Sequence, residues 1–512
     1  MNNAPAILRS LIIYVVCVPL AFFVGYLLTN PLDYSTFAIF GVLALGLIVP
    51  LLLRYHYPWL VFSWYAAIVL FFLKGSPSLW LAMVALSLGI SVLERILSPE
   101  KHFIRVPQLT WPLIFMLAVV VITAKLTEGF GLRSYGGEVY GGRKYILLIA
   151  GIFGYFALTA RRIPLEKARL YVALYFLGIT VGAIGDLYLV TPSWLRPIFW
   201  LVPPSSISGD YFEMGVTRLG NISFAGFGIT CWLMARYGLG GVLFSGKVWR
   251  KALFFLAFVT IFMGGFRNHL VGFAVVFIML FFVEGLHRTR ALLIFGMIGI
   301  LGIVLIIPFS SRLPYTFQRT LAFLPLNLST EARESARGST EWRIEMWKAL
   351  LPQIQQHLLL GEGYAITMED AQMLGRDVAF RPIDASQQGL ALARDYHSGP
   401  ISVILPFGIW GVIALLWFVS AGFPVMYRNF RYGDPALRTI NTFMWVHYFY
   451  VCIRFLILGG VLDLNMMMFT GDLGLSIALN GGVCRPAPQP AREKQARDLV
   501  KSFPRPRPAF QR

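Results

Sequence analysis

The sequence has 512 residues, of which 57% are hydrophobic and only 13% are charged, with a net charge of +19. Soluble globular proteins carry about 25% charged residues, so most of this chain cannot face water and a soluble fold is excluded. In a membrane protein, excess lysine and arginine line the cytoplasmic loops and touch anionic headgroups. We therefore expect a lipid bilayer as partner and no nucleic acid, because no basic patch interleaved with stacking aromatic residues lies outside this membrane pattern.

Apolar runs that can cross a membrane recur along the chain, since a spanning helix needs about 20 apolar residues. The first run lacks a small-residue cleavage site, which favours a spanning helix over a signal peptide. Three runs, 58–73, 251–265 and 291–308, are short enough to be half-spans or paired hairpins, so we expect an all-α polytopic membrane protein with about 12–14 transmembrane helices. The expected spans are 7–28, 36–53, 58–73, 78–96, 110–126, 144–160, 168–190, 219–237, 251–265, 268–286, 291–308, 399–423, 439–459 and 462–480.

The positive charges predict the side of each loop, because basic loops concentrate in the cytoplasm. With both termini inside, the basic tail and five basic segments all fall on the cytoplasmic side. The loop 310–396, with nine basic and ten acidic residues, falls outside. The five segments are 94–105, 161–169, 236–251, 287–290 and 428–438.

This pattern predicts four parts. Residues 1–309 form a transmembrane bundle of about eleven spans, 310–396 an outer loop domain, 397–480 the C-terminal transmembrane helices, and 481–512 a basic, disordered tail. One helix is expected within the loop, beginning at Ser339 or Thr340 and ending at Gly361 and Gly363. Its apolar stripe is expected to lie against the membrane surface or the top of the bundle; it comprises Trp347, Leu350, Leu351, Ile354 and Leu358.

An unusual arginine stands at an outer turn, in the sequence Gly264-Gly265-Phe266-Arg267-Asn268-His269. Most other arginines beside spans fall on the inner side. The two glycines permit close approach of the backbone to a ligand, and an arginine fork suits a phosphate or diphosphate. The alternative is an arginine that snorkels from a helix end to the interface.

Two further residues on the outer side are candidates for chemistry. Arg343 lies in the first turn of the expected loop helix, where the alternative is a surface pair with Glu341 or Glu345. His397 opens the span that follows the loop, and a histidine there can act as base or acid near neutral pH. The alternative for His397 is a satisfied structural side chain.

Arg454, Asp463 and Asp186 lie near the outer ends of their spans, where ionisable residues are costly and usually functional. Arg454 and Asp463 flank one short outer turn, so we expect an ion pair inside the bundle, with a cavity-lining role as the second option. The four cysteines show no CxxC and no paired spacing, so neither a disulfide framework nor a metal site is expected.

Taken together and in this order, the motifs resemble those of the O-antigen ligase and polymerase superfamily. Arg267 corresponds to an outer arginine in a turn rich in small residues. Arg343 and Trp347 match an Arg-x-x-x-Trp helix that is followed by a Gly-x-Gly turn, here Gly361-Glu362-Gly363. His397-Ser398 is followed by nine residues, Gly408, two residues and Gly411. Phe266 stands where the family often has serine, and Leu270 follows Arg267 by three residues where ligases have four.

The resemblance implies a GT-C-like glycosyltransferase in the bacterial inner membrane, with its active site facing the periplasm. Its implied donor is a glycan on undecaprenyl diphosphate and its implied acceptor a hydroxyl of lipid A-core. Arg267 and Arg343 would hold the diphosphate, and His397 would deprotonate the acceptor in a single, inverting displacement. Asn268, His269, Ser398 and Arg454 would contact substrate.

No Asp-x-Asp motif is present, so this resemblance implies transfer that needs neither metal nor cofactor. Three alternatives to a ligase stay open. A polymerase would join two lipid-linked repeat units, with a glycan as acceptor, and a protein O-oligosaccharyltransferase would use a protein hydroxyl. A transporter of the lipid-linked glycan has little need of the large outer loop that ends at His397.

Overall fold

The computed structural model describes residues 34–98, 100, 102–132, 141–205, 218–244, 247–366 and 394–486, with a few single positions between 14 and 25. This part of the chain is helical and contains no strand, only an isolated bridge between Val69 and Ser78. Six of its helices are long and apolar enough to cross a membrane. The prediction of an all-α polytopic membrane protein is therefore confirmed, while the predicted span 7–28 and most of the tail 481–512 lie outside the described residues.

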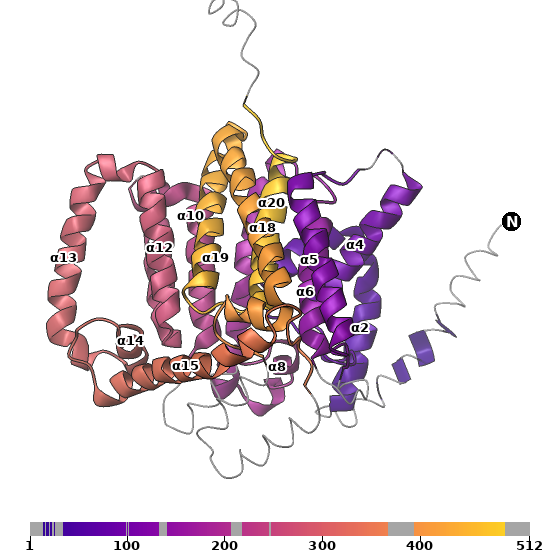
Figure 1. The fold of residues 1–512 in the computed structure, drawn as a ribbon, viewed down its shortest axis with the longest axis horizontal. Helices are drawn as coiled ribbons and strands as arrows, with labels where there is room; N and C mark the ends of the chain where they lie inside the picture. Colours follow the sequence, from indigo (N-terminus) through magenta and orange to yellow (C-terminus); the bar gives the residue numbers. More distant parts are fainter. Residues whose placement is uncertain are drawn as a thin grey trace, which may run out of the picture.

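Most of the helices run alongside one another between two ends of a bundle (Figure 1). They coincide closely with the predicted spans, and α7 (Ala168–Leu177) continues directly into the 3-10 helix η3 (Gly178–Val190). The others are α2 (Tyr34–Arg54), α4 (Leu79–Leu97), α5 (Pro107–Leu126), α6 (Gly142–Leu158), α10 (Gly220–Leu243), α11 (Val248–Ile261), α12 (Arg267–Val283), α13 (Ala291–Phe309), α18 (Ile401–Tyr432), α19 (Arg438–Leu456) and α20 (Leu462–Asn480).

The predicted span 58–73 is wrong as a continuous helix. Only α3 (His56–Ser63) is helical, and irregular backbone follows it. The Tyr57 hydroxyl donates to the Leu158 carbonyl at one end of the bundle, and the Val69 amide donates to the Leu201 carbonyl near the other. Irregular backbone at membrane depth is tolerated where protein surrounds it, as it does around the buried Trp64. The segment therefore runs from one end of the bundle to the other as a broken helix.

The two ends of the bundle differ in what they carry. The connections after α4, α6, α10, α12 and α18, which contain the basic segments, gather at the upper end in Figure 1. At the lower end lie α8 (Ile198–Leu201), α14 (Tyr315–Thr320) and α15 (Thr330–Gln356). This is the separation that charge counting predicted for the loops.

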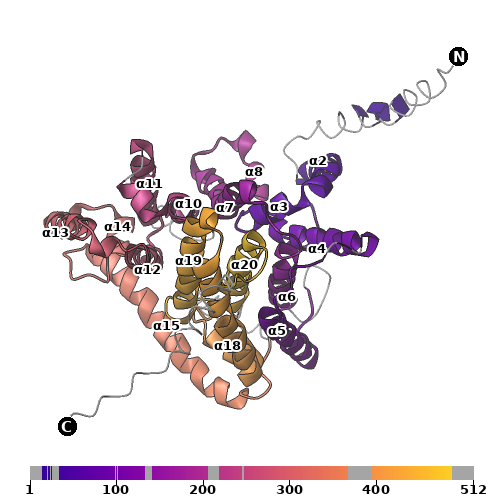
Figure 2. The same cartoon turned by 90° about the horizontal axis from the view of Figure 1, so that it is seen from above.

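Helix α15 crosses the lower end of the bundle almost at right angles to the spans (Figures 1 and 2). It begins about ten residues before the predicted start, since the Ser329 hydroxyl accepts from the Ala332 amide (3.3 Å) and Gly338 continues the helix without strain. Its apolar stripe packs on the start of α18, as predicted for Trp347, Leu350 and Ile354, whereas Leu351 and Leu358 are exposed.

Helices α13 and α20 mark the outside and the inside of the bundle. No residue in the most apolar 18-residue stretch of α13 is buried. Most of the helix is separated from α12 (Figure 1), although Phe295 in its first turns packs on Phe277 and Phe281. Helix α20 lies at the centre and buries polar side chains, including Asn465, Thr470 and Asp472. An apolar exterior around a more polar interior is the arrangement that lipid selects.

Candidate functional site

The turn before α12 packs on two arginine side chains. Gly265 has a φ of +65°, in the left-handed region that favours glycine. The Arg218 Nε donates to the Gly264 carbonyl (2.9 Å), and the Arg319 Nη1 donates to the Gly265 carbonyl (3.4 Å). A Cβ at Gly265 would lie 3.3 Å from the Arg218 Nε. The glycines therefore admit arginine side chains close to the backbone, where the sequence had predicted close approach of a ligand.

Three arginines, Arg267, Arg319 and Arg343, come together at this turn. Arg267 is the first residue of α12, its Nη2 donates to the Thr340 hydroxyl of α15 (3.0 Å), and it interacts electrostatically with the other two. Burial of the guanidinium and then repulsion by Arg319 lower the pKa of Arg343, and Asp395 raises it. The Arg343 Nε is buried and has no hydrogen-bond partner in the part of the chain that the structure describes.

Neither Arg267 nor Arg343 forms an ion pair with a carboxylate among the described residues. The expected alternative for Arg343, a surface pair with Glu341 or Glu345, is therefore not found; Glu341 pairs with Arg337 instead (2.6 Å). Guanidinium groups held beside one another can each present a fork to an anion. The arrangement suits a ligand with several negative charges, such as a diphosphate.

His397 lies beside this cluster in an uncommon backbone conformation. Its φ of +45° is rare for a residue with a Cβ, and such strain collects at functional sites. The Nδ1 is 3.8 Å from an Asp395 carboxylate oxygen, and the ring centroid is 5.7 Å from that of Trp342 on α15. Burial lowers the pKa of His397, Asp395 raises it, and Arg343 and Lys144 lower it, so that it lies below the usual value of a histidine. A neutral imidazole at pH 7 is able to accept a proton.

Side chains from two distant helices hold the backbone that leads into His397. The Lys144 Nζ, on α6, donates to the Arg394 carbonyl (2.8 Å). The Trp347 Nε1, on α15, donates to the Tyr396 carbonyl (2.8 Å). Fixing two of the three preceding peptide units restricts relaxation of the strained residue that follows. Lys144 and Trp347 are therefore positioning residues for the imidazole.

The Gly-x-Gly turn at 361–363 docks on a break in α18. Gly408 interrupts that helix with a φ of +58°, and the Leu405 carbonyl accepts from the Glu362 amide (2.8 Å). A Cβ at Gly408 would lie 2.6 Å from the Leu358 carbonyl oxygen, too close for any residue other than glycine. Close packing therefore explains why Gly408, the glycine of the histidine motif, is a glycine.

Glu362 connects this docked turn to the segment before His397. Its Oε1 is 2.7 Å from the Arg394 Nη1, and both side chains are largely buried. The Arg394 Nη2 also donates to the Ala365 carbonyl (3.1 Å). The turn, the break in α18 and the approach to His397 therefore form one rigid unit.

Two of the residues predicted to contact substrate lie in the packing of the bundle. His269 is buried, its Nδ1 is 2.9 Å from the Ser223 hydroxyl, and its ring packs 4.4 Å from that of Phe224. Arg454 lies between α19 and α20, where its guanidinium donates to the Met468 sulfur. The structure does not bring either side chain to the three-arginine cluster.

Ser398 and Asn268 directly follow His397 and Arg267 in sequence. The Ser398 hydroxyl accepts from the Ile401 amide (3.5 Å) at the start of α18. Asn268 is half-buried, and its side chain forms no hydrogen bond within the described part of the chain. Of these two, Asn268 has the freer polar group for a ligand.

The expected ion pair between Arg454 and Asp463 is not present among the described residues. Helix α20 packs mainly on α6, so Asp463 in its first turn interacts electrostatically with Lys144 of α6 instead. Asp186 has a different role again, since its carboxylate accepts from the Ile222 amide (2.9 Å) at the start of α10. The described residues contain no group of three or more His, Cys, Asp or Glu that could hold a metal ion.

Sequence reasoning missed Lys144, Arg319 and Asp395. Lys144 carried a usable signal, because it is a cation at the outer end of a predicted span, as Arg267 is. Arg319 carried none, since nothing distinguishes it from the other charged residues of the outer loop until the fold places it against Gly265. Asp395 stands two residues before His397, but only the turn of the backbone brings its carboxylate back toward the imidazole.

Comparison with known proteins bears on the same region. No curated protein matches the chain. Residues 252–416 match the model of the family described as O-antigen ligase, a segment that runs from α11 into α18 and contains Arg267, Arg343 and His397. Proteins of this family are glycosyltransferase-type ligases and polymerases of lipid-linked glycans in bacterial membranes. The match supports an assignment of this chain to the superfamily of O-antigen ligases and polymerases.

Proposed function

We propose that this protein is an O-antigen ligase that transfers a glycan from undecaprenyl diphosphate to a hydroxyl of lipid A-core. The observation that carries the proposal is the meeting of Arg267, Arg319 and Arg343 beside His397. A diphosphate leaving group needs several cations, and an attacking hydroxyl needs a base nearby. Both requirements are met at one end of the bundle, within the segment that matches the O-antigen ligase family.

The proposed reaction is a single displacement. His397 accepts the proton of the acceptor hydroxyl while that oxygen forms a bond to the anomeric carbon. The bond from this carbon to the diphosphate oxygen breaks, and its electron pair leaves with undecaprenyl diphosphate. Arg267 and Arg343, supported by Arg319, stabilise the charge that develops on the leaving group. Attack opposite to the leaving group inverts the anomeric configuration, and neither metal nor cofactor takes part.

We assign the end that carries His397 to the periplasm and the basic end to the cytoplasm of a bacterium, with both termini cytoplasmic. Residues 310–396 then form a periplasmic loop domain between the transmembrane parts 1–309 and 397–480, and 481–512 are a cytoplasmic tail. In this assignment helix α15, which crosses that end of the bundle (Figure 1), would lie on the periplasmic surface. The exposed α13 faces lipid, on a side from which the undecaprenyl chain can reach the arginines.

The test is reconstitution in vesicles with a lipid-linked glycan as donor, with and without lipid A-core, and with and without EDTA. A ligase gives glycan attached to lipid A-core, with inverted linkage, in EDTA as well. Longer lipid-linked glycan without lipid A-core identifies a polymerase instead, and transfer to an added protein acceptor an O-oligosaccharyltransferase. Movement of the intact donor across the bilayer without any new glycosidic bond would overturn the assignment as an enzyme.

A further inference from the structure

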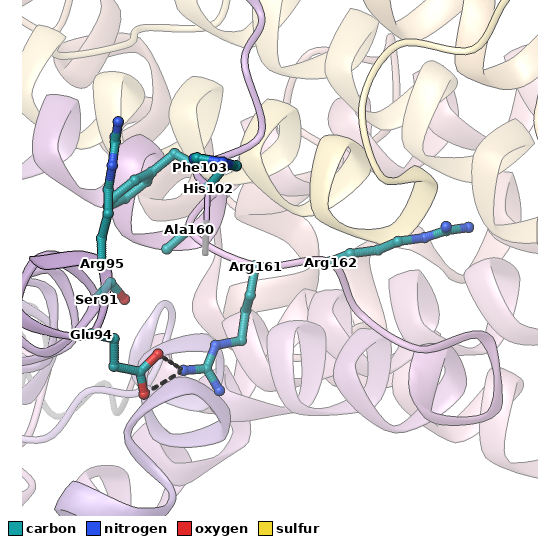
Figure 3. Close-up of a pocket in the computed structure, with 8 residues that line it drawn as sticks. All are labelled: Ser91, Glu94, Arg95, His102, Phe103, Ala160, Arg161 and Arg162. Carbon is teal, nitrogen blue, oxygen red and sulfur yellow. Dashed lines mark hydrogen bonds and ion pairs between the residues drawn. The ribbon is translucent and has the colours of Figure 1, made fainter. Parts of the chain in front are cut away.

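A second polar site lies at the opposite end of the bundle from His397. A cavity of about 410 Å³ opens there between the end of α4 and the segment that follows α6 (Figure 3). Its lining includes Ser91, Arg95, His102, Arg161 and Arg162. The proposed glycosyl transfer uses none of these residues.

Arg161 is held in place by a chain of hydrogen bonds. Its Nη2 is 3.0 Å from the Nε2 of His56 and 3.2 Å from an oxygen of Glu94 (Figure 3). His56 is buried, and its Nδ1 is 2.9 Å from the buried Ser87 hydroxyl. An arginine that only adds positive charge to a loop needs no such hydrogen bonds to hold its side chain. The remaining N–H groups of the fixed Arg161 fork are left for a ligand.

The cavity also carries polar groups that form no hydrogen bond or ion pair with a described residue. Ser91 is 6% exposed, and its hydroxyl has no hydrogen-bond partner among the described residues. Arg95 and Arg162 extend away from the Arg161–Glu94 pair around the cavity, and neither forms an ion pair within the described part of the chain (Figure 3). The cavity lining thus contains three arginines and one carboxylate, and the excess positive charge suits an anion with several acceptor oxygens.

A second, mainly apolar cavity of about 350 Å³ adjoins the first. The two share Arg95 and Phe103, and the Arg95 guanidinium lies 5.8 Å from the centre of the Phe103 ring. Leu88, Phe153 and Phe156 line the second cavity. A charged cavity beside an apolar one fits an amphiphile better than a free ion.

Helix α4, which supplies Ser91 and Arg95 to the cavity lining, also exposes apolar side chains that suit contact with lipid. Leu93, Ile96 and Leu97, in the last turns of α4, are 59%, 70% and 81% exposed. We propose that this is a binding site for an anionic phospholipid, with the phosphate among Ser91, Arg161 and the neighbouring arginines and an acyl chain along Phe153 and Phe156. The site is independent of the glycosyltransferase assignment.

Native mass spectrometry and thermal unfolding of the detergent-solubilised protein test the site. The probes are phosphatidylglycerol, phosphatidylcholine with the same acyl chains, and inorganic phosphate. We expect phosphatidylglycerol to remain bound and to raise the melting temperature more than either other probe does. The double variant Arg95→Gln/Arg162→Gln should weaken phosphatidylglycerol binding about tenfold, because each substitution removes a charge-assisted contact. Arg161→Gln should weaken it at least as much.

The matched control is Arg428→Gln/Arg431→Gln, which removes two charges at the same end of the bundle but outside the cavity. Retained phosphatidylglycerol binding in the control, together with loss in the cavity variants, supports the site. Equal loss in both double variants would show general attraction to a basic surface and overturn the proposal. Full stabilisation by inorganic phosphate, with no preference between the lipids, would overturn a phospholipid as the occupant. Should Arg161→Gln fail to fold, the double variant still decides, because Arg95 and Arg162 lack its hydrogen bonds.

Discussion

The two ends of the bundle are both rich in arginine, but they hold it differently. At the basic end Arg161 pairs with Glu94, and the arginines beside Tyr237 lie over its ring. At the end that carries His397, arginines lie beside one another. Arg343 is largely buried and is repelled by Arg319. It forms no ion pair with a carboxylate in the described chain.

This difference shows that the number of cations does not identify the active site. An arginine at a membrane surface costs little, because water and headgroups solvate it. A partly buried arginine next to another is destabilising unless something else compensates. The His397 end therefore retains an arrangement that a bound anion would stabilise, and the following predictions test whether that arrangement is catalytic.

The largest expected effect separates histidines at the two ends. His397→Ala should lower the rate of glycan transfer by about 10²–10⁴, the usual contribution of a general base. His287→Ala, at the basic end, should leave the rate within about twofold. Both rates are measured in vesicles containing equal amounts of folded protein. Transfer by His397→Ala at the rate of the His287 variant would remove His397 from the mechanism.

The second largest effect on the rate of transfer is expected from arginine substitutions at the two ends. Arg343→Gln and Arg267→Gln should each slow transfer about 10–100-fold, because each removes charge-assisted contacts to the leaving diphosphate. Arg343→Lys should recover part of the rate, since it restores the charge without the fork. The control Arg431→Gln removes an exposed charge from the last turn of α18 and should change little. Similar losses in Arg343→Gln and Arg431→Gln would mean that net charge, not the site, matters.

Much of this fold could be predicted from the sequence, because lipid imposes simple rules on length and charge. Apolar runs located α4, α5, α12 and α20 to within a few residues. The prediction of a continuous helix over 58–73 was wrong because apolar composition does not distinguish a helix from irregular backbone enclosed by protein, as around Trp64. The predicted start of α15 was wrong for a local reason. Ser339 and Thr340 are residue types that cap helices, but Ser329 is the residue that caps α15.

The candidate site was less accessible to sequence reasoning. Arg267, Arg343 and His397 stood out by their predicted side and by motif, and the structure brings them together at one end of the bundle. Lys144 lies 250 positions from Arg394 in sequence, so only the three-dimensional fold reveals their contact. His269 shows the opposite error, since its position beside Arg267 in sequence suggested a ligand contact that the helix directs into the bundle instead.

The positioning residues should show a smaller loss with a distinct signature. Lys144→Met removes the donor to the Arg394 carbonyl and should lower kcat about tenfold, comparable to loss of one charged hydrogen bond, with little change in KM. Lys144→Arg should restore much of the rate. The control Lys125→Met alters a cation near the same end, in the last turn of α5, and should be nearly silent. A rise in KM with unchanged kcat would instead place Lys144 in substrate binding.

The smallest effect is a shift in the pH profile. Transfer requires neutral His397, so activity is present above its pKa and is lost as pH falls through it. Burial holds the pKa of His397 below its usual value, the Asp395 carboxylate raises it, and Arg343 lowers it. Asp395→Asn should therefore move the acid limb to lower pH by about half a unit, and Arg343→Gln should move it to higher pH by a similar amount. The two shifts are read from kcat/KM between pH 4.5 and 8, roughly the range that spans histidine titration.

Opposite displacements of the acid limb in the two variants would show that the group titrating in catalysis lies between these two charges, as His397 does. If the acid limb moves in neither variant, the group that titrates in catalysis lies outside this site. The different arrangement of arginines at the two ends would then have no role in catalysis.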